Sequence, residues 1–98
     1  MPKPYRNKSY RRYVASQPCF GCGAEGYSQC AHANGGGMGT KASDADTFPL
    51  CCTRPGVLGC HAEFDQCIGM TKQGRRDLTL DYVAKMQRRA ALDGWRLP

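Results

Sequence analysis

The sequence predicts one small α+β domain stapled by a bound zinc ion. Two observations carry this prediction: short segments with strand-like and helix-like patterns follow one another, and seven cysteines are spread through the chain. A chain of 98 residues buries only a modest fraction of its surface, so its core needs an additional staple. We treat residues 1–98 as a single domain whose chemistry lies in a core at about 18–69.

Caps and turn residues set the boundaries of the expected elements. Ser9 is the expected N-cap of a short basic helix that Pro18 ends. The run GGGMG after Asn34 excludes regular structure there, so a loop must separate two strand-like runs. The expected elements in this part of the chain are a helix at 9–17, strands at 27–34 and 48–52 around a loop at 35–43, and a helix at 60–66.

A C-terminal amphipathic helix is expected at about 79–93, with Thr79 as its N-cap and Gly94 as its stop. Apolar residues recur there at every fourth position, which places them on one face of a helix. That stripe consists of Leu78, Tyr82, Met86 and Ala90, with Val83 beside it.

The formal charge of +6 is concentrated at the two ends of the chain. Residues 1–17 carry five basic side chains and no acidic one, and residues 75–98 carry six basic against three acidic side chains. The middle, 18–74, is mildly acidic. Basic ends suit a polyanionic partner, although a solvated surface kept for solubility explains them equally well.

The sequence indicates a cytoplasmic protein without a membrane anchor. Its first residues have no apolar stretch after their charges, and no later run reaches membrane-spanning length. Cytoplasmic thiols stay reduced, so clustered cysteines point to a metal rather than to disulfides, and seven cysteines cannot all pair within one chain. A mature secreted domain that has lost its signal is the alternative.

The cysteine spacing predicts a structural zinc site. Cys19 and Cys22 form a CxxC turn, and a second pair downstream would complete a tetrahedron. Cys60 is the first choice in that second pair, together with Cys51 or Cys52. Neighbouring residues on a strand face opposite sides, so only one of these two ligates easily, and we favour Cys51.

The remaining sulfur and imidazole groups leave one alternative open. Cys30 and Cys67 are expected to be buried apolar thiols rather than ligands. A Cys3His site with His61 as the fourth ligand is the competing prediction, and it would remove His61 from any catalytic role.

Several motifs occur in a familiar order. A CxxC knuckle, a histidine at a strand end, a loop leading to PLC and a CH pair opening a helix together resemble the HNH endonucleases of the ββα-metal fold. The fragments YRRYVASQPCFGCG, AHANGGGMGTKASDADTFPLC and GCHAEFDQ are similar to small phage nucleases of the recombination-enhancement kind and to short prophage proteins. The resemblance covers roughly residues 10–69.

This resemblance implies specific roles. His32 corresponds to the histidine that activates water, and Asp44 or Asp46 to the polar residue that orients it. His61 and Asp65 correspond to ligands of a catalytic divalent ion, Mg²⁺ or Mn²⁺, with Zn²⁺ as the alternative. Independently of the family, two residues four apart on a helix share one face and can grip one ion.

The sequence departs from the family pattern in two places. Many relatives carry Asp or His as a metal ligand directly before the first histidine, where this chain has Ala31. The insertion TRPGVLG also stretches the distance between the Cys51–Cys52 pair and Cys60. The catalytic ion is therefore left with two protein ligands, which Mg²⁺ tolerates because it retains waters. Alternatively, His32 is itself a ligand.

The expected partner is DNA, contacted through phosphates. GGGMGTK lacks the context of a Walker motif, but its amides and Lys41 suit a DNA phosphate. The other expected phosphate contacts are Arg11, Arg12, Arg75, Arg76, Arg88 and Arg89.

These observations predict a metal-dependent DNA endonuclease or nickase, encoded by a phage or prophage and acting in recombination or DNA processing, with recombination proteins as possible partners. Two alternatives remain: a non-catalytic zinc-stabilised DNA-binding module, and a zinc-stabilised protein-interaction domain.

Overall fold

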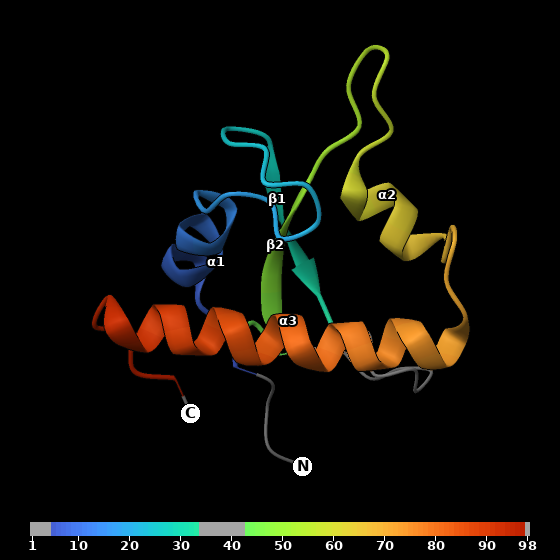
Figure 1. The fold of residues 1–98 in the computed structure, drawn as a ribbon. Helices are drawn as coiled ribbons and strands as arrows, with labels where there is room; N and C mark the ends of the chain where they lie inside the picture. The colour runs from blue at the N-terminus through green and yellow to red at the C-terminus, as the bar shows by residue number, and fades with distance from the viewer. Residues whose placement is uncertain (1–4, 34–42, 98) are drawn as a thin grey trace.

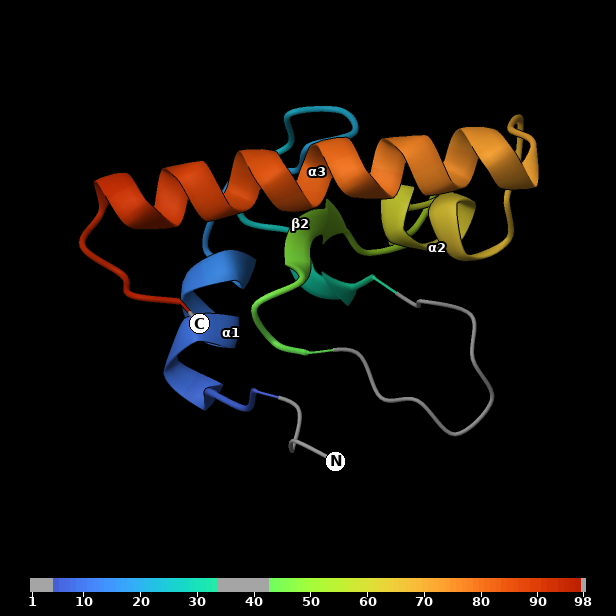
Figure 2. The ribbon, with the colours of Figure 1, turned by 90° about the horizontal axis from the view of Figure 1, so that it is seen from below.

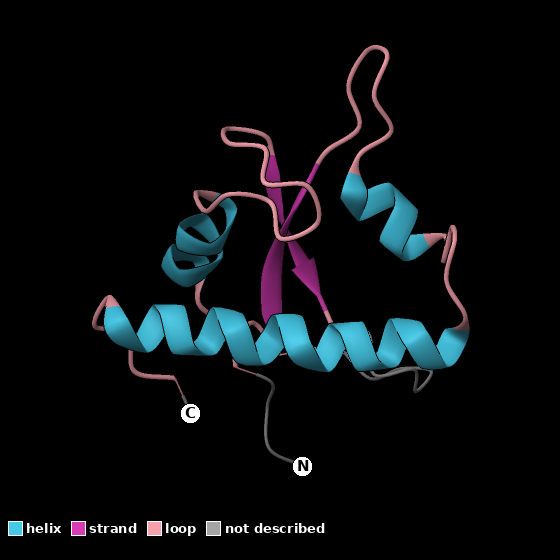
Figure 3. Cartoon of the chain, in the orientation of Figure 1, coloured by secondary structure: helices cyan, strands magenta, loops and turns pink. Residues whose placement is uncertain are grey.

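The computed structural model describes residues 5–33 and 43–97 of the chain. It is a small α+β structure, as expected, built from a two-stranded sheet and three helices in these residues. In chain order the elements are α1 (Lys8–Ala15), β1 (Ser28–His32), β2 (Thr47–Cys51), α2 (Cys60–Asp65) and α3 (Lys72–Leu92). Figures 1, 2 and 3 show α3 running along one side of the molecule, with the hairpin packed against it between α1 and α2.

The hairpin forms the centre of the fold. β1 and β2 pair antiparallel, with Ser28 opposite Cys51 at one end and His32 opposite Thr47 at the other. All five residues of β2 are buried because α1, α2 and α3 cover this strand. The Phe48 ring packs against Phe64 of α2 at 5.4 Å between centroids, and against Tyr82 of α3 at 5.3 Å.

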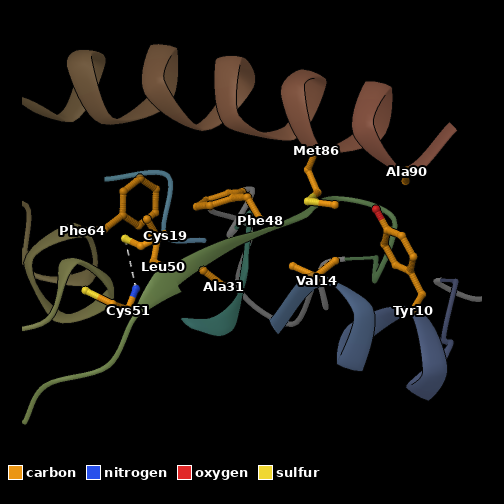
Figure 4. Close-up of a cluster of buried hydrophobic side chains, with 10 residues drawn as sticks. All are labelled: Tyr10, Val14, Cys19, Ala31, Phe48, Leu50, Cys51, Phe64, Met86 and Ala90. Atoms are coloured by element: carbon orange, nitrogen blue, oxygen red, sulfur yellow. Dashed lines mark hydrogen bonds between the residues drawn. The ribbon is translucent and has the colours of Figure 1, made fainter. Parts of the chain in front are cut away.

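The hydrophobic core joins every element of the fold (Figure 4). Tyr10 and Val14 of α1 and Met86 of α3 are fully buried in this core. Each such side chain stabilises the fold by about 1.5–3 kcal/mol through burial of apolar surface. Trp95, after the end of α3, packs edge-on against Tyr10 with centroids 5.1 Å apart and so ties the C-terminal segment to α1.

The first helix begins earlier and ends earlier than the sequence predicted. Its N-cap is Asn7, whose side chain accepts a hydrogen bond from the Tyr10 amide at 3.1 Å, and Ser9 lies inside the helix. Asn and Ser are equally good N-caps, so the sequence pattern alone did not choose between them. The helix ends at Ala15, before Pro18.

The last helix is longer than predicted. It starts at Lys72 rather than near Thr79, because the Thr71 hydroxyl caps it by accepting from the Gly74 amide at 3.0 Å. Thr79 lies inside the helix, where its hydroxyl donates to the Arg75 carbonyl at 2.7 Å. The prediction relied on the apolar stripe, and the first turns of α3 are polar. The stripe itself is confirmed: Met86 and Ala90 are buried, and Leu78, Tyr82 and Val83 pack against the core.

The insertion between β2 and α2 forms a projecting loop, visible at the top of Figure 1. Arg54 and Val57 pair through two backbone hydrogen bonds of 3.0 and 2.8 Å, closing a tight turn at Gly56, whose φ is 79°. Val57 and Leu58 are exposed at this turn. Across residues 5–33 and 43–97, no helix has both the length and the apolar character needed to cross a membrane.

Candidate functional site

Four cysteines from three separate segments meet at one end of the hairpin. The sulfur atoms of Cys19, Cys22, Cys51 and Cys60 all lie within 4.8 Å of one another. Zn–S bonds of about 2.3 Å place the sulfurs of a tetrahedral site about 3.8 Å apart, and the Sγ atoms of Cys22 and Cys51 are 3.7 Å apart. The cluster can therefore bind a metal, and its geometry is compatible with structural zinc.

The backbone around these cysteines leaves no room for larger residues at two glycines. A Cβ atom on Gly21 would lie 2.7 Å from the Cys60 sulfur, so the knuckle closes only with glycine there. A Cβ atom on Gly59 would lie 2.3 Å from the carbonyl carbon of Cys52. The turn before α2 thus brings Cys60 close to β2 only because residue 59 has no side chain.

Backbone amides point at the sulfur atoms and favour their thiolate form. The Cys19 sulfur accepts from the amides of Gly21 at 3.2 Å and Cys51 at 3.3 Å, and the Cys51 sulfur accepts from the Cys60 amide at 3.3 Å. Burial opposes ionisation of Cys51, but the Cys60 amide and the Arg54 side chain outweigh it and lower its pKa to about 6.

Ionisation of Cys60 is opposed by its surroundings in the cluster. Burial and the neighbouring sulfurs raise the pKa of Cys60 well above its ordinary value. One thiolate therefore forms readily in the cluster, whereas a full set needs a compensating positive charge, which a divalent metal provides.

The other sulfur and imidazole candidates lie outside the group. Cys51, and not Cys52, belongs to it. Cys30 and Cys67 are partly exposed free thiols rather than the buried ones we expected, Cys67 in a left-handed turn at φ 53°. His61 is absent from the group, so the described residues do not form the alternative Cys3His site.

His32 lies at the end of β1 beside a buried carboxylate. Its Nε2 atom is 2.9 Å from Oδ1 of Asp44, and its side chain is 30% exposed. Asp46 has a different role: its carbonyl accepts from the Ala33 amide, and its side chain lies 3.4 Å from the Gln87 amide nitrogen. Of the two aspartates that the resemblance offered, Asp44 is the one that contacts His32.

Asp44 is fully buried and contacts several donors. The Asn7 amide donates to Oδ2 at 2.8 Å, Arg6 donates to Oδ1 at 3.2 Å, and Arg11 forms an ion pair with Oδ2 at 3.2 Å. Burial alone would raise the pKa of Asp44, yet the contact with His32, the hydrogen bond from the Asn7 amide and the charge of Arg11 hold it below its ordinary value. Sequence analysis missed Arg6, because 38 positions separate it from Asp44 and no local motif links them.

His61 and Asp65 form a second pair, on α2. Nε2 of His61 is 3.5 Å from Oδ2 of Asp65, and Nδ1 of His61 is 3.0 Å from the Gln29 side-chain oxygen. Arg75 approaches the other Asp65 oxygen at 3.9 Å. No hydrogen bond in the described part of the chain joins this pair to His32, and the pair has no third ligand there.

The predicted DNA-contacting arginines outside the Asp44 contacts lie on α1 and α3. Arg75 and Arg89 of α3 lie over the rings of Phe64 and Phe20, at 4.8 and 5.2 Å from the ring centroids. Arg12, Arg76 and Arg88 are exposed. Lys41 lies outside the described residues.

Comparison with known proteins gives a family without an assigned function. No curated protein and no solved structure matches the chain. A family model described as "Protein of unknown function (DUF968)" matches residues 1–71. That match includes the four-cysteine cluster and both histidine pairs, and it stops at the N-cap of α3. Since it spans well over half of the sequence, the chain belongs to the DUF968 family.

Proposed function

We propose that this protein is a metal-dependent DNA endonuclease or nickase of the HNH type, acting in phage recombination or DNA processing in the bacterial cytoplasm. The main support is the contact between His32 and Asp44. A carboxylate only accepts hydrogen bonds, so Nε2 of a neutral His32 must carry the ring proton. Nδ1 is then left as an acceptor and can take a proton from a water molecule.

The chemistry follows from that proton transfer. A water oxygen attacks phosphorus as His32 Nδ1 removes its proton, and the bond from phosphorus to the leaving sugar oxygen breaks. Asp44 holds the imidazole in the required tautomer and stabilises the charge that it gains. A divalent ion would relieve charge on the phosphate. His61 and Asp65 are the residues that would hold it, with water and phosphate oxygens completing its coordination.

The four-cysteine cluster has a separate, structural role in this proposal. Cys19, Cys22, Cys51 and Cys60 hold one Zn²⁺, which fixes the knuckle to β2 and to the start of α2. Cys60 and His61 are adjacent, so the zinc site sets the position of the helix that carries the second histidine pair.

A non-catalytic, zinc-stabilised DNA-binding module is the second candidate. The observation that favours it is Ala31, which is buried at 1% exposure and offers no ligand where many HNH relatives have one. With two ligands on α2 and none on β1, a catalytic ion would be held weakly.

Plasmid cleavage separates the two candidates. Purified protein is incubated with supercoiled plasmid and Mg²⁺ or Mn²⁺, and the nicked and linear products are quantified. His32→Ala should lower the rate by about 10²–10⁴-fold, as for loss of a general base, while zinc content remains unchanged and the protein still binds DNA. Asp65→Ala should instead weaken binding of the divalent ion, so that a higher Mn²⁺ concentration partly restores its activity.

Two results would contradict the nuclease proposal. One is an inactive wild-type protein that contains zinc and shifts duplex DNA in a salt-dependent manner; the DNA-binding module would then be the correct function. The other is a His32→Ala variant that cleaves at the wild-type rate.

A further inference from the structure

The carboxylate of Asp44 has more positive partners than its own charge requires. It is completely buried, and one cation would be enough to compensate it. Two arginines contact it, Arg6 at Oδ1 and Arg11 at Oδ2, each at 3.2 Å. His32 is the third side chain that contacts this carboxylate. With His32 neutral, the two arginines and Asp44 together carry a net positive charge.

The surplus charge faces solvent. The side chains of Arg6 and Arg11 are 44% and 43% exposed, whereas Asp44 itself is 0% exposed. His32, on the same carboxylate, is 30% exposed. Solvent therefore reaches the side chains of Arg6, Arg11 and His32, whereas it does not reach the carboxylate that all three contact.

The arginines also keep most of their donor capacity. A guanidinium has five N–H groups in a planar fork that matches two oxygens of a phosphate. Arg11 contacts Asp44 through Nε, and Arg6 contacts it through Nη1. Within residues 5–33 and 43–97, Asp44 is the acceptor that each of these side chains contacts. The carboxylate therefore orients both guanidinium groups and leaves most of their N–H donors free of contacts with the described residues.

We propose that Arg6, Arg11 and His32 form an anion site that takes one phosphate group of a nucleic-acid backbone. This proposal rests on the proposed nuclease function, because it places that phosphate next to the nitrogen assigned as the base. Asp44 then positions three groups together: the imidazole and both arginines.

Inorganic phosphate tests this site without requiring cleavage. The chain has two histidines, so the imidazole region of an NMR spectrum of the zinc-loaded protein contains two ring systems. Titration with phosphate at constant ionic strength should shift the His32 ring signals in a saturable manner and leave those of His61 unchanged. His61 is an internal control because its ring contacts Gln29 of β1 and Asp65 of α2 instead of Asp44.

Variants identify which arginines matter. Arg6→Gln and Arg11→Gln should each weaken phosphate binding at His32 by about tenfold, as for loss of a charge-assisted hydrogen bond. The matched control is Arg96→Gln, which removes an exposed arginine on the C-terminal segment and should leave binding unchanged. Elemental analysis and circular dichroism verify that each variant keeps its zinc and its fold.

The outcomes distinguish this site from the nuclease function. Selective phosphate binding at His32 in a protein that never cleaves DNA would support the anion site and contradict the nuclease. If the protein cleaves DNA but phosphate shifts neither histidine, or if Arg11→Gln and Arg96→Gln bind phosphate equally, the two arginines only neutralise Asp44 and the anion site is wrong.

Discussion

Removing the metal from the four-cysteine cluster should unfold this domain rather than loosen it. Eleven apolar side chains are buried among the described residues, and two of them, Cys19 and Cys51, are themselves in the cluster. A domain of this size has a net stability of about 5–15 kcal/mol. Structural zinc contributes about 10–16 kcal/mol in small zinc-dependent domains at neutral pH. The contribution of the metal is thus as large as the whole net stability.

The assay combines metal analysis with thermal unfolding. Native protein should contain one zinc per chain, and a strong chelator should abolish both near-ultraviolet circular dichroism and the cooperative thermal transition. Cys60→Ser should lose zinc and the transition together, whereas Cys67→Ser, outside the cluster, should keep both. If the chelated protein melts at the same temperature as the native one, the cluster is not a structural metal site.

Three further predictions concern the packing around the candidate sites. In urea unfolding, Gly59→Ala should destabilise the protein by about 3 kcal/mol or more, since its Cβ atom would overlap the backbone. The control Gly74→Ala should differ from wild type by less than about 1 kcal/mol. Equal effects of the two substitutions would contradict the close approach of Gly59 to the Cys52 backbone. Asp44→Asn should lower stability by about 2–4 kcal/mol at pH 7. The pKa of Asp44 is lower in the folded protein than in the unfolded chain. The stability difference between wild type and Asp44→Asn is therefore fully present above the unfolded-state pKa of about 3.9, and it should shrink as the pH falls below that value. A stability difference that persists in acid would rule out the ionised carboxylate as its source. Met86→Ala should cost about 2–5 kcal/mol, against less than about 0.5 kcal/mol for Leu92→Ala, which is 88% exposed; a small loss at Met86 would place it outside the core.

Local sequence patterns predicted the elements and the cysteine group well. The CxxC spacing predicted Cys19 and Cys22, and the alternation of side chains along a strand predicted that only one of Cys51 and Cys52 would join Cys60; the favoured Cys51 is the one in the group. The CxxC spacing and the strand alternation both reflect geometry within a few residues, so a local sequence pattern is enough to identify them. The apolar stripe of α3 was found for the same reason.

Contacts between distant segments could not be predicted in this way. The Arg6–Asp44 ion pair and the His61–Gln29 contact join residues 38 and 32 positions apart, and nothing in either local sequence marks its partner. The start of α3 was missed because its first turns are stabilised by the Thr71 cap rather than by an apolar face. Apolar residues at every fourth position identify the part of a helix that packs against the core, but they do not identify helical turns made of polar residues.

The projecting loop between β2 and α2 offers a practical handle on this protein. Its turn at Gly56 is closed by its own Arg54–Val57 hydrogen bonds, and its base is fixed by the Thr53 hydroxyl, which accepts from the Gly59 amide at 3.0 Å. Exposed turns of this kind are the positions where inserted sequence is best tolerated. A short fluorophore-binding tag placed after Gly56 would therefore label the protein outside its hydrophobic core.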